Sequence, residues 1–185
     1  MMRVIFIILL LIGSINAEKW FRHYGVSKND NLTSMTKTKD SGFIFVGSST
    51  TLGNGRSDLW VLKTDDSLNF NWQRFYGGPF DDLGKKIFPQ KDGFIIIGQK
   101  ITPTSKDIWI LKIDSKGKKE WEKVFNNKND NIVHSIEELK GVGFIVTGVE
   151  EISFKESQGF ILLLDKNGET IWKKVFGGRE KDGLF

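Results

Sequence analysis

The chain has 185 residues, of which 39% are hydrophobic and 27% charged, a composition typical of a single soluble globular domain. Its formal net charge is +4, but the lysines are scattered among aspartates and glutamates, which argues against a nucleic-acid-binding face. The absence of cysteine excludes a disulfide-stapled scaffold and a lipid anchor on an N-terminal cysteine.

The first seventeen residues have the plan of a secretory signal peptide. Met1–Arg3 form a short basic start, Val4–Ile12 are all apolar, and Ala17 offers a small residue at a cleavage point. The alternative is a membrane anchor, but these apolar residues would span roughly 14 Å as a helix, about half of a bilayer core. We therefore predict cleavage after Ala17, no stable membrane span, and a secreted, periplasmic or cell-surface location.

From residue 20 onwards the sequence repeats with a period close to fifty residues. Four related segments begin with a tryptophan, at intervals of 52, 49 and 51 residues: Trp20, Trp72, Trp121 and Trp172. The predicted domain, 18–185, therefore contains units 20–71, 72–120 and 121–171 and a partial unit 172–185. A fixed period of this size indicates a modular array, in which one small unit cannot bury its apolar face alone.

Each complete unit contains the signals of four strands. After the tryptophan strand come an aspartate-containing turn, a weak strand, a glycine-bracketed apolar run and a second apolar run. Short runs rich in aromatic and β-branched residues, bounded by glycine and aspartate, predict β-strands. Because these runs are apolar at both alternating positions, we expect neighbouring sheets to cover them on both faces. The predicted weak strands are 32–37, 83–88 and 132–139, and the apolar runs are 42–47, 93–98 and 143–148, then 58–63, 107–112 and 158–163.

A connection of fixed length joins the second apolar run to the next tryptophan. The spacing of seven residues recurs from Asp65 to Trp72, from Asp114 to Trp121 and from Asp165 to Trp172. Gly117 and Gly168 occupy the position at which such a hairpin turn needs a positive φ, and the constant turn length fixes the strand register. The first copy has Leu68 at this position, so we expect its turn to differ or to depend on Asn69.

Four-stranded units of about fifty residues are the blades of β-propellers. The segments Phe75-Tyr76-Gly77-Gly78, Asp92–Gly98 and Asp107–Asp114, followed by Trp121, resemble the secreted bacterial β-propeller repeats (SBBP-like). The Asp-x-x-Gly-x-x-x-Trp hairpin is similar to the docking segment of quinoprotein propellers. The resemblance covers residues 20–185 and implies blade architecture on a scaffold that serves many different partners. The sequence departs from it at Asn126-Asn127, which replaces the Gly-Gly pair.

The strand inventory does not close a ring. Propellers close with four to eight blades, whereas this chain has three complete units and Gly177–Phe185, which matches the segment after Tyr76. We therefore expect an all-β, propeller-like array of four-stranded antiparallel blades, three copies plus the start of a fourth. This incomplete ring would be the N-terminal part of a longer propeller. The alternative is a short protein that completes itself through its open blade faces, with copies of itself or another blade protein.

No residue constellation in the sequence indicates a catalytic, cofactor or metal site, and we predict none. All six tryptophans, including Trp60 and Trp109, occupy repeated positions, which favours packing over ligand stacking. Repeated turn aspartates are expected to accept hydrogen bonds from backbone amides, and Asp165–Glu169 lacks the ligand spacing of a calcium loop. His23 and His134 fall at unrelated repeat positions, so we expect surface or turn residues rather than a nucleophile–base pair.

The expected function is therefore a non-catalytic binding or structural role at the cell surface, with a protein or glycan as ligand. The alternative is a fragment of a propeller enzyme, quinoprotein or glycan-active, whose catalytic residues lie in missing blades. The loops that vary between copies are the expected ligand face: 49–56, 100–106 and 150–157.

Overall fold

The computed structural model of the protein describes residues 23–25, 29–126, 129–153 and 156–177. The predicted signal peptide, Trp20 and residues 178–185 of the partial unit lie outside these ranges. Within them the protein is entirely β-structure, with twelve strands and no helix.

The strands form three separate four-stranded sheets, and every neighbouring pair is antiparallel and consecutive in the chain. This confirms the all-β class and the four-stranded unit. The repeat tryptophans that the structure describes lie in the fourth strand of each sheet: Trp72, Trp121 and Trp172. The first sheet consists of β1 (Asp30–Lys37), β2 (Phe43–Ser49), β3 (Asp58–Thr64) and β4 (Phe70–Tyr76). The second consists of β5 (Asp82–Gln90), β6 (Gly93–Ile101), β7 (Lys106–Asp114) and β8 (Lys119–Phe125). The third consists of β9 (Asp130–Leu139), β10 (Gly143–Glu151), β11 (Ser157–Asp165) and β12 (Thr170–Phe176).

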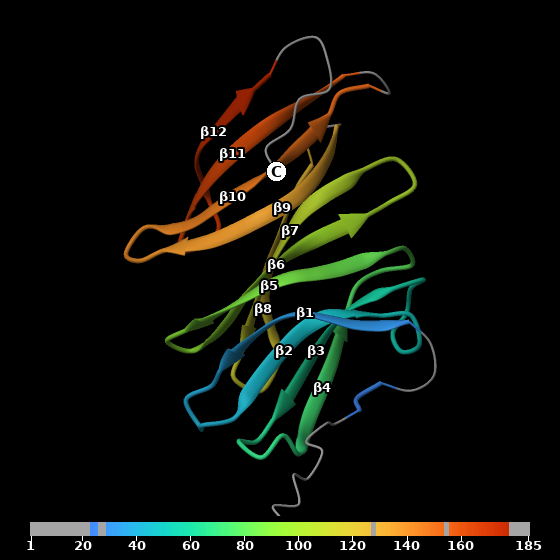
Figure 1. Ribbon diagram of the computed structural model, residues 1–185, viewed down its shortest axis with the longest axis vertical. Helices are drawn as coiled ribbons and strands as arrows, with labels where there is room; N and C mark the ends of the chain where they lie inside the picture. The colour runs from blue at the N-terminus through green and yellow to red at the C-terminus, as the bar shows by residue number, and fades with distance from the viewer. Residues whose placement is uncertain (1–22, 26–28, 127–128, 154–155, 178–185) are drawn as a thin grey trace, which may run out of the picture.

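The sheets stack face to face along the long axis of the molecule, with the second sheet in the middle (Figure 1). Strand β6 shows how the middle sheet is covered. Phe94 and Ile96 belong to the core shared with the first sheet, whereas Ile95 and Ile97 belong to the core shared with the third. The prediction that the apolar runs are covered on both faces is therefore confirmed for this sheet.

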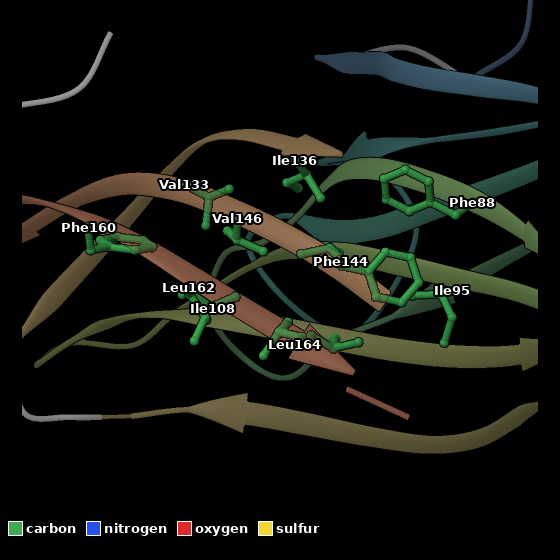
Figure 2. Close-up of a cluster of buried hydrophobic side chains, with 12 residues drawn as sticks. Phe88, Ile95, Ile108, Val133, Ile136, Phe144, Val146, Phe160, Leu162 and Leu164 are labelled. Carbon is green, nitrogen blue, oxygen red and sulfur yellow. The ribbon is translucent and has the colours of Figure 1, made fainter. Parts of the chain in front are cut away.

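The core between the second and third sheets is built from β5, β6, β7, β9, β10 and β11 (Figure 2). Its largest side chains include Phe88 and Phe144, whose ring centroids are 5.1 Å apart at an interplanar angle of 48°. Burial of such apolar surface stabilises the stack by roughly 25 cal/mol per Å². The stack is open: the three sheets do not close into a ring.

The hairpin turns after β3, β7 and β11 share one geometry. In each turn an aspartate side chain accepts hydrogen bonds from the backbone amides two and four residues later, at 2.7–2.9 Å: Asp65, Asp114 and Asp165. Gly117 and Gly168 have φ of +79° and +75°, as predicted. Leu68 adopts φ +62° in the same turn, and Asn69 adds a 2.9 Å side-chain hydrogen bond to Asp65. The first turn thus keeps the repeated geometry and, as expected, depends on Asn69.

Candidate ligand-binding site

A pocket of about 520 Å³ lies where the first and second sheets meet. Three turns surround it: the β1–β2 turn, the β5–β6 turn and the β7–β8 turn, and the first two lie on the same side of the stack (Figure 1). Strand β3 contributes Lys63, and β6 contributes Phe94. The remaining lining residues are Lys37, Thr38, Lys39, Asp40, Pro89, Gln90, Lys91, Asp92, Gly93 and Ser115.

Lys63 is the buried charge of this pocket, with a side chain only 5% exposed. Its ammonium donates a 2.8 Å hydrogen bond to the carbonyl oxygen of Thr64 and lies 2.9 Å from a carboxylate oxygen of Asp40. A buried charge needs such partners, because removing it from water without compensation is costly. An ammonium has three N–H donors, so these two contacts leave one donor for a ligand.

Asp40 is held in its ionised form. A hydrogen bond from the Thr38 hydroxyl, followed by the contact with Lys63, lowers the pKa of the Asp40 carboxyl. The lining contains four lysines but only two aspartates, so positive charge remains in excess around the pocket. A concave surface lined by one sign of charge concentrates ligands of the opposite sign.

The pocket walls are linked across the two sheets. The Lys39 ammonium donates a hydrogen bond to the carbonyl oxygen of Lys91, which joins the β1–β2 turn to the β5–β6 turn. These segments are about fifty residues apart in the chain and occupy equivalent places in successive sheets. The pocket is therefore a product of stacking and not of one sheet alone.

Lys112 in the second sheet is the repeat counterpart of Lys63. It also contacts the carbonyl oxygen of the next residue, at 3.2 Å, but its carboxylate partner is Glu120, at 3.0 Å. Glu120 lies on β8 of the same sheet, whereas Asp40 lies on a turn that borders the pocket. In both sheets the lysine therefore contacts a backbone carbonyl oxygen and a carboxylate. Only in the first sheet does that carboxylate, Asp40, border the pocket.

The opposite end of the sheets carries the variable loops and a group of buried carboxylates. Asp82 at the start of β5 is 1% exposed, and one of its carboxylate oxygens accepts a 2.8 Å hydrogen bond from the Gly78 amide. Burial, together with the nearby charges of Asp58 and Asp81, raises the pKa of the Asp82 carboxyl. The strand register places Asp30 of the first sheet and Asn131 of the third sheet at the equivalent position.

A smaller cavity of about 160 Å³ lies between the second and third sheets. Its lining is mostly apolar, with Ile108, Phe125 and Leu162, and includes the polar side chains of Asn126 and Lys173. Its size corresponds to a few water molecules rather than to a sugar or a peptide. The larger pocket is therefore the better candidate for a ligand.

Four of the five tryptophans in the described part of the chain lie in packed positions, and the fifth is exposed. Trp60 and Trp109 are buried, Trp72 and Trp121 are half-buried against the two cores, and Trp172 is exposed on β12. None of them is among the residues that line the larger pocket. His23 and His134 are both exposed, as expected for surface residues, and lie outside both pocket linings.

Sequence reasoning placed the ligand face at the variable loops 49–56, 100–106 and 150–157, which connect the opposite strand ends from those at the larger pocket. The sequence marked the β7–β8 turn only as a hairpin of fixed length, and no pattern indicated that the three turns meet, so sequence reasoning did not find the pocket. The one available signal was Lys63, a lysine at the end of an otherwise apolar run.

Among the residues that the structure describes, no group of three or more histidine, aspartate or glutamate side chains is arranged to hold a metal ion. The same residues include no helix long and apolar enough to cross a membrane. Compared with known proteins, the chain matches no protein-family model and no curated protein sequence.

Proposed function

We propose that this protein is a non-catalytic β-propeller-type repeat protein that binds an anionic ligand, such as an acidic glycan, between its first two sheets. The observation that carries the proposal is the pocket of about 520 Å³ with excess lysine and the buried Lys63 ammonium in its wall. The lysine ammonium is a compact positive charge with three hydrogen-bond donors, which suits carboxylate, sulfate or phosphate groups. A pocket built mainly from turns on a rigid sheet scaffold is a common setting for binding.

A propeller-type arrangement is supported by the repeated four-stranded meander and by the face-to-face stacking of successive sheets. The open stack is consistent with the N-terminal part of a longer propeller. The apolar N-terminal segment and the resemblance to secreted bacterial repeats support a secreted, periplasmic or cell-surface location. A binding or structural role there would require no catalytic group in these three sheets.

The test is a calorimetric titration of the purified chain with galacturonate oligosaccharides, using fully methyl-esterified oligosaccharides as the neutral control. We expect binding of the charged form only. Replacing Lys39 and Lys91 together by methionine should weaken it by about tenfold or more, because each charge-assisted hydrogen bond contributes roughly 1.5–3 kcal/mol. Lys140→Met is the matched control, since Lys140 lies in the equivalent turn of the third sheet. Equal affinity for charged and neutral oligosaccharides would exclude the proposed chemistry.

An enzyme fragment is the competing function, and the open stack is the observation that favours it. Further sheets could carry catalytic residues of a quinoprotein or glycan-active propeller. Activity screening of a protein that contains these three sheets and any further ones separates the two functions. Turnover that single loop substitutions abolish would reject the non-catalytic proposal.

A further inference from the structure

The fourth strand of each sheet packs on a turn of the next sheet. In the first interface, the Trp72 ring lies against Gly117 in the β7–β8 turn: a methyl group on Gly117 would come within 2.8 Å of the ring. The Tyr76 hydroxyl also donates a hydrogen bond to the Gly117 carbonyl oxygen. The fourth strand and the glycine turn therefore form one contact between neighbouring sheets.

The second interface repeats this contact. The Trp121 ring lies against Gly168 in the β11–β12 turn, where a methyl group on the glycine would come within 3.3 Å of the ring. Phe125, in the place of Tyr76, packs against the same core. A side chain larger than hydrogen at the turn position would push the tryptophan away in either interface.

Among the residues that the structure describes, no fourth sheet lies against the equivalent face of the third sheet. Trp172 is paired with Leu163, as Trp72 is with Lys63 and Trp121 with Lys112, so all three tryptophans project from the equivalent face. Trp172 is 36% exposed and Phe176 is 45% exposed. Ile145 and Ile161 on the same face are half-buried, whereas their counterparts in the first two sheets are completely buried: Ile44, Val61, Ile95 and Ile110.

A second copy of the chain does not offer a suitable turn. In the described part of the chain, both glycine turns are already packed, one against Trp72 and the other against Trp121. The corresponding turn of the first sheet has Leu68 in place of the glycine, with φ +62°. Its carbonyl oxygen accepts a hydrogen bond from the Tyr24 hydroxyl, the same kind of contact that Tyr76 makes with Gly117.

We infer that the Trp172 face of the third sheet is a docking surface for one further four-stranded sheet of this repeat, whose third-to-fourth-strand turn carries glycine. The inference rests on the proposed function, because a longer propeller supplies such a sheet. It concerns the end of the stack away from the ligand pocket. A failed ligand titration would therefore not contradict the docking surface, and a failed docking test would not contradict the ligand pocket.

The test extends the chain by one sheet of known sequence. Residues 78–125 take the place of residues 178–185 after Gly177, so that the new junction reproduces the sequence at Gly77 and Gly78. The readout is backbone amide exchange, measured peptide by peptide. We expect exchange in β12 (Thr170–Phe176) to slow by about tenfold or more, because the strand gains a packed neighbour. Exchange in β6 and β7 serves as the internal check that the original three sheets are folded.

Two variants of the extended chain test the chemistry of the contact. Leucine at the appended copy of Gly117, which reproduces the Leu68 turn, should remove most of the added protection of β12. Trp172→Ala should do the same, whereas the matched exposed substitution Ile152→Ala should not.

Three results would overturn the inference. The first is an amide exchange rate in β12 that does not change when the sheet is appended, whether or not the appended sheet folds. Another is equal protection by the glycine and leucine turns. The last is a concentration-dependent dimer of the unextended chain that Trp172→Ala abolishes, because a second copy would then be the occupant.

Discussion

Replacing Trp109 by alanine should be among the most damaging single changes to the stack. Trp109 is 2% exposed on β7 and belongs to the core between the first and second sheets, with Ile96 and Leu111 among its partners. Its indole nitrogen donates a 2.9 Å hydrogen bond to Glu122. Lys100 also places its ammonium 4.7 Å from the ring centroid.

The expected loss is about 3–5 kcal/mol, the range for truncating a fully buried tryptophan to alanine. The cavity would lie in the middle sheet, where neighbours on both faces limit collapse. Since whole domains are stable by only about 5–15 kcal/mol, Trp109→Phe provides a milder second variant that should retain the fold. Trp172→Ala on the exposed face of β12 should cost about 1 kcal/mol or less.

The assay is guanidinium unfolding followed by circular dichroism, because tryptophan fluorescence changes with the substitution itself. A common m-value among the variants would license comparison of their free energies of unfolding. Equal losses from Trp109→Ala and Trp172→Ala would refute the reasoning, since an open stack gives the two residues different environments.

Two further substitutions test local features. Asp82→Asn introduces the asparagine that the third sheet has at this position, Asn131, and should raise stability at pH 7 by about 1–3 kcal/mol, because it removes a buried carboxylate. The pKa of Asp82 is raised, so the folded state binds this proton more tightly than the unfolded state does. The contribution of Asp82 therefore makes stability fall as the pH rises from the ordinary aspartate pKa of 3.8 through the folded-state pKa. Urea unfolding between pH 4 and pH 8 should show this slope in the parent but not in the variant, and identical slopes would contradict the assignment. Gly117→Ala should cost about 1–3 kcal/mol from its positive φ and more from contact with Trp72. Gly141→Ala has a nearly equal φ of +80° and open space around it, so it should show the backbone cost alone; equal losses at both glycines would exclude the packing contact.

Much of the fold is predictable because its signals are local. Glycine and aspartate bracket each apolar run, and the constant spacing from aspartate to tryptophan fixes the hairpins. The apolar character of both alternating positions in 93–98 also predicted that this strand would be covered on both faces, which β6 confirms. Leu68 shows the limit of such reasoning: two aspartate-capped amides and Asn69 hold a positive φ on a residue that rarely adopts one.

The contacts between sheets are harder to predict from the sequence. The pocket needs Lys63 from β3, the β1–β2 turn and the β5–β6 turn of the next sheet to meet, and no local pattern connects these segments. The packing of each tryptophan on the following glycine turn likewise depends on how successive sheets are rotated. Repeated positions reveal which residues pack, but only the stacked structure shows which residues they pack against.

The most direct test of the proposed binding site is an NMR titration of the isotopically labelled chain with galacturonate oligosaccharide, followed through backbone amide chemical shifts. Binding in the pocket between the first two sheets should produce saturable shifts in the turns around Asp40, Asp92 and Ser115. The amides of 49–56, 100–106 and 150–157 should remain unchanged, because these loops lie at the opposite strand ends. Saturable shifts confined to those loops, or no saturable shifts at all, would contradict the proposed binding site.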